Sequence, residues 1–438
     1  MSGPASFTRD VFAKYGAALA FPDYRTMWTA SLAAGTAAWA LIVARGWFIY
    51  QANERSSDVA IVTFSALLPA LIVPPIVGVY ADRLDRKKIL AASYAANLFA
   101  NLLLAALGFA DILGVTEMLG LPPLLGLWQV VVLSIVNGAA RYTQMTVSQA
   151  LAANLVPRNV LLNALSLNRA TNQFSRLVGA AAVTPILAAV GAPLAFLVCT
   201  GLYGVGWFLT MRIKTVSTGT AKAGESFFSN LAGGFRYIRT QPLIMMVIVM
   251  VCFHCSLTMG FESTLPAFAR QRLGSTEMFG VLMTAVGVGS LFGSIYVGGI
   301  SSALLRGRLL LVTGVLSGFG QVMLSFAPDI AFAYVAAVLM GATQAAFMTL
   351  GEAITQAVAD DGYRGRIASV NTMSFQGLMA VMNLSNGVMS DIVGPQLVLV
   401  VTGSAFMLIM LGGFLVATSR DIYVNGIPDR AMAIAHGA

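Results

Sequence analysis

Residues 168–176, NRATNQFSR, place two arginines and three amide side chains inside an otherwise apolar run. This run, Leu161–Val190, is long enough to cross a bilayer. Four of the polar residues recur at spacings of three, four and seven, which puts them on one helical face: Arg169, Asn172, Gln173 and Arg176. Charged side chains within a membrane normally face the interior of a helix bundle or water, so the pattern predicts a surface that binds an anionic group.

Polar residues in other apolar runs extend this candidate surface. Arg141 and Gln144 share a helical face in the run Leu124–Ala150, and Arg45 lies in the outer half of the run Met27–Tyr50. The predicted substrate-binding residues are Arg45, Arg141, Gln144, Arg169, Asn172, Gln173, Arg176, Asn371 and Gln376. A buried ion pair, such as Arg141 or Arg169 with Glu352, is the alternative use of these arginines, and the two uses could alternate in one cycle.

A histidine and two acids within apolar runs are candidates for proton coupling. His254, Thr258 and Glu262 are spaced four apart, which places them on one face of a continuous helix, and Glu352 lies in the run Ile330–Ile354. Imidazole and carboxyl groups can take up and release protons. The alternative is that these side chains form a stripe of hydrogen bonds that packs helices together.

The composition defines the elements that must position these residues. The chain has 438 residues, of which 58% are hydrophobic and only 10% charged, whereas soluble domains carry about 25% charged residues. The prediction is an all-α integral membrane protein of twelve transmembrane helices, arranged as two six-helix bundles around a central cavity. The twelve runs are Met27–Tyr50, Val59–Tyr80, Ile89–Phe109, Leu124–Ala150, Leu161–Val190, Ala192–Met211, Leu243–Ala267, Phe279–Ile300, Leu309–Phe326, Ile330–Ile354, Ile367–Val393 and Gln396–Ala417.

The positive charges predict the orientation. Of the 26 Lys and Arg residues, 19 fall in segments that lie inside when the N-terminus is inside, and three fall outside. This bias predicts a multi-pass protein of the cell inner (plasma) membrane with both termini cytoplasmic. Because the net charge of +8 resides mostly in these short loops, it does not indicate a nucleic-acid partner.

An internal repeat predicts the domain organisation. When the sequence is shifted by 203 positions, Gly138 matches Gly341, and the same register pairs Asn168 with Asn371 and Gln173 with Gln376. The predicted domains are an N-terminal bundle (1–215), a cytoplasmic linker with a short amphipathic helix near residues 227–237 (216–240), and a C-terminal bundle with a cytoplasmic tail (241–438). Such parallel repeats place a substrate site near the bilayer midplane.

The loop after the second run, GVYADRLDRKKIL, combines acids with a basic run. Such a cluster can hold two helices together and release them when the helices move. The predicted conformational latch consists of Gly78, Asp82, Arg83 and Arg86. The alternative is a loop that only sets topology through its positive charge.

In this loop the sequence resembles the major facilitator superfamily. Its Gly, Ala-Asp-Arg and basic-run signature matches Gly78, the stretch 81–83 and the stretch 86–88. The segments FPDYRTMWTASL, GWFIY and LVPRNVLLNALSLN are similar to the branch that includes the enterobactin exporter and the macrolide efflux pumps. The resemblance implies export of a siderophore, drug or other metabolite, driven by protons.

These observations predict a secondary transporter that works by alternating access on an anionic or amphipathic small molecule. The alternatives are a flippase for lysophospholipid-type lipids and a membrane sensor or chaperone that does not transport. No nucleophile–base constellation, cofactor motif or metal cluster is visible, so we expect neither an enzyme nor a cofactor. The expected partners are a small-molecule substrate and the lipid bilayer, with the chain acting as a monomer.

Overall fold

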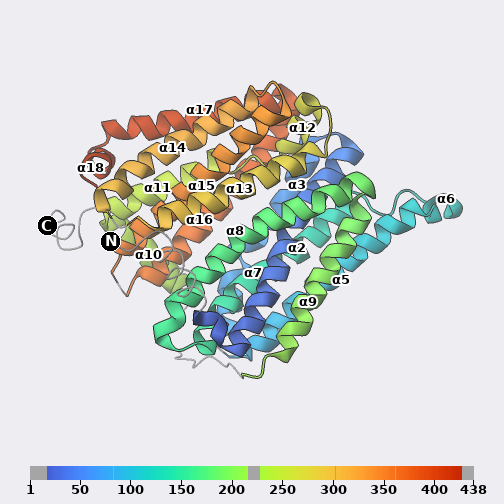
Figure 1. Ribbon diagram of the computed structural model, residues 1–438, viewed down its shortest axis with the longest axis horizontal. Coiled ribbons are helices and arrows are strands. Elements are labelled where there is room, and N and C mark those ends of the chain that lie inside the picture. The colour runs from blue at the N-terminus through green and yellow to red at the C-terminus, as the bar shows by residue number, and fades with distance from the viewer. Residues whose placement is uncertain (1–16, 82, 216–226, 301, 361, 427–438) are drawn as a thin grey trace, which may run out of the picture. The chain divides into compact units, whose positions relative to one another are not determined.

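The computed structural model describes residues 17–81, 83–215, 227–300, 302–360 and 362–426, and its ribbon is drawn in Figure 1. Helices account for all regular secondary structure of these residues. Contacts divide the chain into two compact units. Unit 1 takes Met1–Arg45 and Leu68–Ala223, and unit 2 takes Gly46–Leu67 and Gly224–Ala438. The long first helix, α2 (Pro22–Asn53), contributes its first part to unit 1 and its last part to unit 2.

The helices of unit 1 pack mainly around α5. This helix contacts α9 and α7, and α7 also contacts α4 and α8. Helices α2 and α8 pack closely at Gly179 of α8. A Cβ at this position would meet the backbone oxygen of Thr36 on α2 at 2.5 Å, so the contact requires glycine. Besides the start of α2, unit 1 contains η1 (Ala17–Ala20), η2 (Leu68–Leu71), α4 (Val73–Ala81), α5 (Arg86–Ile112), α6 (Val115–Leu119), α7 (Leu127–Leu155), α8 (Arg158–Ala189) and α9 (Ala192–Arg212).

The helices of unit 2 pack around α13, α14 and α15, which Figure 1 shows as neighbouring ribbons. The α13–α15 contact is so close that a Cβ on Gly289 or Gly341 would collide with backbone of the facing helix. The helices of unit 2 are α3 (Ser56–Leu67), α10 (Phe227–Thr240), α11 (Pro242–Leu257), α12 (Leu265–Leu273), α13 (Met278–Gly298), α14 (Ala303–Ser325), α15 (Ile330–Val358), α16 (Arg364–Val393), α17 (Pro395–Gly412) and α18 (Ala417–Asn425), together with η3 (Gly413–Leu415).

Helix α3 is held to α16 by an aspartate. The carboxylate of Asp391 accepts hydrogen bonds from the backbone N–H groups of Ser56, at 2.7 Å, and Ser57, at 2.9 Å. These groups belong to the first turn of α3, whose N–H groups have no partner within the helix and carry a partial positive charge. Asp391 therefore caps α3 from another helix of the same unit.

Eight helical segments of the described residues are long and apolar enough to cross a membrane. They are Pro22–Asn53, Ser56–Gly78, Arg86–Ile112, Ala192–Arg212, Met278–Gly298, Ala303–Ser325, Ile330–Val358 and Pro395–Leu415. A ninth arises if α10 and α11 count as one span, although these two helices are bent by 112°. The chain is therefore a multi-pass membrane protein, while the count of twelve spans stays a prediction. Helices α7, α8 and α16 carry many of the polar residues considered above.

The seventh predicted run is a broken helix, which corrects one expectation. Helix α11 ends at Leu257 and α12 begins at Leu265, so Glu262 lies in the turn between them. Pro266 explains the break, because a proline ring clashes with the carbonyl of the residue four positions earlier, here Glu262. His254, Thr258 and Glu262 therefore do not form one continuous helical face.

Side-chain amides satisfy the backbone groups that the break exposes. The amide of Gln344 donates to the Thr258 carbonyl at 2.6 Å, and that of Asn386 donates to the Gly260 carbonyl at 2.7 Å. Gln321 makes a longer contact, 3.4 Å, with the Leu257 carbonyl. Non-helical backbone at membrane depth is tolerated only where such partners are available. Three helices, α14, α15 and α16, thus contribute the amides that stabilise the break.

Candidate functional site

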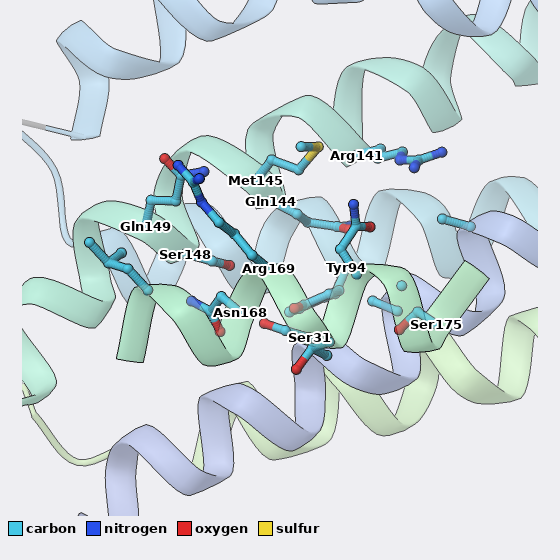
Figure 2. Close-up of a pocket in the computed structure, with 16 residues that line it drawn as sticks. Ser31, Tyr94, Arg141, Gln144, Met145, Ser148, Gln149, Asn168, Arg169 and Ser175 are labelled. Carbon is cyan, nitrogen blue, oxygen red and sulfur yellow. The ribbon is translucent and has the colours of Figure 1, made fainter. Parts of the chain in front are cut away.

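The candidate site is a cavity inside unit 1, with a volume of about 280 Å³. It lies between α2, α5, α7 and α8, and Figure 2 shows its side chains. Polar side chains make up much of its wall. The lining residues are Ser31, Ala34, Gly35, Ala38, Tyr94, Arg141, Gln144, Met145, Ser148, Gln149, Leu165, Asn168, Arg169, Thr171, Asn172 and Ser175.

Helix α7 presents one polar face to this cavity. Arg141, Gln144 and Ser148 are three and four residues apart and therefore project on the same side of the helix. Figure 2 shows them in a row with Arg141 at one end and Gln149 at the other. Eight residues of α-helix span about 12 Å, so the row can contact both ends of a small molecule.

Helix α8 contributes the second arginine. Figure 2 shows the Arg169 side chain extending from α8 toward the Gln149 end of the α7 row. Arg141 and Arg169 thus line different parts of one cavity. Among the described residues that line it, none is an aspartate or glutamate. The wall is therefore cationic and rich in hydrogen-bond donors, a combination suited to carboxylate, phosphate or sulfonate groups.

Trp39 connects the two arginine-bearing helices beside the cavity. The guanidinium carbon of Arg141 lies 5.1 Å from the centre of the Trp39 ring, and that of Arg176 lies 4.8 Å from it. The indole N–H also donates to the side-chain oxygen of Asn172, at 3.4 Å. A cation over a tryptophan face stabilises by about 0.5–1 kcal/mol when exposed and about 2 kcal/mol or more when desolvated. The ring therefore helps to orient Arg141.

The structure brings together four of the predicted binding residues and separates the others. Arg141, Gln144, Arg169 and Asn172 line the cavity. Gln173 and Arg176 are on the same helix as Arg169 but are not lining residues, and Arg176 is only 5% exposed. Asn371 and Gln376 belong to α16 of unit 2. The helical face that we predicted around Arg169 is therefore divided between the cavity and the packed interior.

Arg45 also lies away from the cavity lining. It is 6% exposed, and its guanidinium donates to the hydroxyl of Ser134 at 2.8 Å and to the Leu41 carbonyl at 3.1 Å. A buried guanidinium needs such acceptors to offset its desolvation. These contacts are internal to the helix packing.

The proton-coupling candidates of unit 2 occupy different surroundings. His254 is fully buried, stacks on Phe347 at 4.5 Å and packs edge-on against Phe406 at 5.1 Å. Its Nε2 lies 3.2 Å from the hydroxyl of Ser317. Glu262 and Glu352 are each half-buried, the first in the α11–α12 turn and the second on α15. Their role in proton transfer stays a prediction.

The predicted latch loop is described except for one member. Asp82 lies outside the described residues, Gly78 belongs to α4, and Arg83 is exposed. Arg86 donates to the carbonyls of Ala81 and Ala150, both at 3.1 Å, and so ties the end of α4 to α7.

Asp85 and Lys87 of the same acid–base cluster form further contacts, although they were not among the four predicted latch residues. Asp85 caps the N-terminus of α5 by accepting a hydrogen bond from the Lys87 backbone N–H, at 3.0 Å. The Lys87 ammonium donates to the Ile213 carbonyl after α9, at 2.6 Å. The residues of this loop are thus bonded to the start of α5, to α7 and to the end of α9.

Sequence reasoning missed several lining residues. Tyr94 on α5 and Ser31 on α2 line the cavity, and neither was among the predicted binding residues. Asn168, which the predicted binding residues did not include, lines the cavity, and its side-chain oxygen lies 3.4 Å from the Tyr24 hydroxyl. Helical periodicity does place Ser148 on the Arg141 face, and the structure finds it in the lining, whereas the packing of α5 is what brings Tyr94 to the site.

The described residues contain no group of three His, Cys, Asp or Glu side chains placed to hold a metal ion. The lining side chains themselves offer hydrogen-bonding groups and two guanidinium charges. This arrangement can bind and orient an anion that also carries apolar surface.

Comparisons with known proteins decide the family. The sequence profile of the transmembrane secretion effector family matches residues 15–423. The chain belongs to this family of the major facilitator superfamily. It is thus a transporter of that superfamily, as the motif at Gly78–Lys88 indicated.

Two curated relatives are transport proteins. The multidrug efflux pump Tap of Mycolicibacterium fortuitum is 23% identical over 351 residues, which cover 78% of this chain and 82% of Tap. The staphyloferrin A transporter of Staphylococcus aureus is 18% identical over 357 residues, 81% of this chain and 86% of that protein. Among solved structures, a mutant of the nucleoside transporter NupG is similar with a TM-score of 0.71 at 10% identity, covering 90% of this chain and 99% of that one. This last likeness shows a shared fold.

Proposed function

We propose that this transporter exports an anionic, amphipathic small molecule by alternating access, with proton uptake as the driving reaction. In this proposal the chain resides in the cell inner membrane with both termini cytoplasmic, in accord with its loop charges. The names of its relatives, a multidrug efflux pump and a staphyloferrin A transporter, favour export of a small metabolite or drug.

The observation that carries the proposal is the cationic cavity of unit 1. Arg141 and Arg169 line the same space, and the lining residues described there include no carboxylate. An ionised group inside a membrane protein is costly to retain and normally serves a substrate or ion path. Hydrogen bonds between guanidinium and an anion contribute about 1.5–3 kcal/mol each, so two such groups favour anions over cations of equal size.

The apolar lining residues are the reason for proposing that the substrate is amphipathic. Ala34, Ala38 and Leu165 offer apolar contact, while Met145 adds an adaptable thioether side chain. Tyr94 also lines the cavity, with its side chain almost fully buried. A ligand with one acidic group and a hydrocarbon or aromatic body would satisfy both kinds of wall.

Proton coupling is assigned to unit 2 in this proposal. The candidates are Glu262 in the helix break, Glu352 on α15 and His254. The two half-buried carboxylates are better placed than the enclosed histidine to exchange protons with water. We therefore expect Glu262→Gln or Glu352→Gln to abolish proton-driven transport while leaving ligand binding intact.

A matched ligand pair tests the binding part. Purified full-length protein in nanodiscs would be titrated with 1-naphthoate and with 1-naphthylmethylammonium, which share a ring system and differ in charge. A ligand that binds the folded state raises the thermal midpoint by mass action. The proposal expects stabilisation by naphthoate alone; equal effects, or stabilisation by the cation alone, would refute the anionic preference.

Inverted membrane vesicles test direction and coupling. Uptake of naphthoate into such vesicles corresponds to export from the cell, and it should collapse when a protonophore dissipates the gradient. Uptake that persists without any proton gradient would contradict proton coupling, and uptake only in right-side-out vesicles would contradict export.

A further inference from the structure

Unit 2 contains a cluster of three sulfur atoms that the transport proposal does not use. The thiol of Cys255 lies 3.5 Å from the thioether sulfur of Met348 and 3.8 Å from that of Met259. Cys255 is on α11, Met259 is in the turn that follows it, and Met348 is on α15. Three sulfur side chains thus converge from α11, the turn that follows it, and α15.

The spacing suits a three-coordinate metal ion. Thiolate sulfur lies about 2.3 Å from a bound zinc ion, and three sulfurs at such a distance in a trigonal plane are about 4 Å apart. The two sulfur–sulfur distances at Cys255 are close to this value. Cys255 is fully buried, whereas Met259 and Met348 are half-buried, so the cluster is not sealed from its surroundings.

The ligand types select the class of metal. Thiolate and thioether sulfur are soft ligands that favour Cu(I) and its analogue Ag(I). Zinc, calcium and magnesium need imidazole, carboxylate or several thiolates, and the described residues offer no group of three such side chains. The alternative explanation, sulfur atoms that only fill space in the core, requires no affinity for any metal.

We propose that Cys255, Met259 and Met348 form a binding site for a monovalent soft metal ion, Cu(I) or Ag(I). On binding, the Cys255 S–H bond is exchanged for a sulfur–metal bond and one proton is released, while both thioethers donate a lone pair without proton change. The ion would tie the turn after α11 to α15. Since this turn contains Glu262, occupancy would also restrain the helix break.

Silver binding to the full-length protein tests the site independently of transport. Protein in nanodiscs, with any affinity tag removed, would be dialysed against silver nitrate in buffer free of chloride and thiols, and bound silver measured by elemental analysis. We expect one tightly bound Ag(I) per chain. The same ion should raise the thermal midpoint of the wild type.

Variants locate the binding. Loss of a group that only hydrogen-bonds to a metal ligand typically weakens metal binding by about 10- to 100-fold. Cys255→Ser removes a direct ligand, the thiolate of the proposed site, and should therefore weaken binding by more than about 100-fold. Met348→Leu conserves volume and should weaken it by about 10-fold or more. Cys252→Ser, three residues earlier on the same helix, is the matched control and should bind as the wild type does.

The opposite results overturn the site. They are wild-type protein that holds no more silver than Cys255→Ser, a Cys252→Ser variant that loses binding equally, or zinc that displaces silver at equal concentration. Circular dichroism of each variant before silver addition checks its fold. If Cys255→Ser does not fold, the volume-conserving variants Met259→Leu and Met348→Leu decide, since unchanged affinity in both contradicts the proposal.

Discussion

The two units use repeat-related positions for different purposes. Arg141 in unit 1 and Gln344 in unit 2 correspond under the shift of 203 residues. Arg141 lines the cavity and contacts Trp39, whereas Gln344 is 1% exposed and donates to the Thr258 carbonyl in the helix break. The next polar position differs likewise, since Gln144 lines the cavity and its counterpart Phe347 stacks on His254.

This difference shows where each unit uses its polar side chains. In unit 1 they face a cavity, where a ligand can be their partner. In unit 2 the amides of Gln321, Gln344 and Asn386 bind backbone carbonyls of the broken helix. Substitutions in the first group should therefore alter ligand binding, and substitutions in the second should alter stability.

The largest effect is expected from the double variant Arg141→Gln/Arg169→Gln. Each guanidinium–anion hydrogen bond contributes about 1.5–3 kcal/mol, so loss of both should cost about 3–6 kcal/mol of binding free energy if they act independently. Titration of naphthoate measured by thermal shift checks this. The Arg141→Lys/Arg169→Lys control retains the charge and should recover part of the affinity. If the Gln double variant bound naphthoate with unchanged affinity, the cavity would not be the binding site.

The second test compares Gln344→Leu with Gln144→Leu. Gln344→Leu leaves the Thr258 carbonyl without its 2.6 Å donor, and a buried unsatisfied polar group costs about 1–3 kcal/mol of unfolding free energy. Gln144 lines the cavity, and its Nε2 has no hydrogen-bond partner within the described part of the chain. Its replacement should therefore change stability little. Denaturation in mixed micelles measures the unfolding free energy of both variants. Equal losses of stability would contradict the proposed difference between the two units.

Asp391→Ala tests a second internal contact of unit 2. The substitution removes the acceptor of two N–H groups at the start of α3, and loss of a helix cap costs about 0.5–2 kcal/mol. The same denaturation experiment applies. Asp391→Asn keeps one acceptor oxygen and should lose less stability, so an Asn variant as unstable as the Ala variant would show that the negative charge, rather than hydrogen-bond acceptance, matters.

The smallest expected effect is that of Trp39→Phe. This change keeps an aromatic ring beside Arg141 and Arg176 but removes the indole N–H that contacts Asn172. A cation–π contact at a partly exposed ring contributes about 0.5–1 kcal/mol, and phenylalanine retains part of it. Naphthoate affinity should fall by no more than about fivefold with unchanged stability. A loss as large as that of the arginine double variant would make Trp39 itself a principal binding group.

Hydropathy and sequence motifs were sufficient to predict that the chain is a helical membrane protein and to predict its superfamily. The apolar runs identified a helical membrane protein, and the loop at Gly78–Lys88 identified the superfamily that the family profile also matches. Periodicity placed Arg141 and Gln144 on one face because a single helix fixes the spacing of its own residues. The same reasoning could not place Tyr94, which reaches the cavity from a different helix.

The break between α11 and α12 marks the limit of the periodicity argument. His254 and Glu262 have helical spacing, yet the turn at residues 258–264 separates them. Pro266 was a visible signal, since it prevents the helix from continuing through Glu262. The amide donors that bind the carbonyls exposed by the break, Gln344 and Asn386, are more than 80 residues away in sequence.

By itself, then, the sequence determined that this chain crosses a membrane repeatedly, that it belongs among the major facilitator transporters, and which helices carry its membrane arginines. Each of these follows from local composition, spacing or a short motif. Only the tertiary structure decided that Arg141 and Arg169 share a cavity while Arg45 and Arg176 are enclosed by other side chains. The physical reason is that the surroundings of a charged side chain depend on the rotation and packing of neighbouring helices, which no single helix encodes.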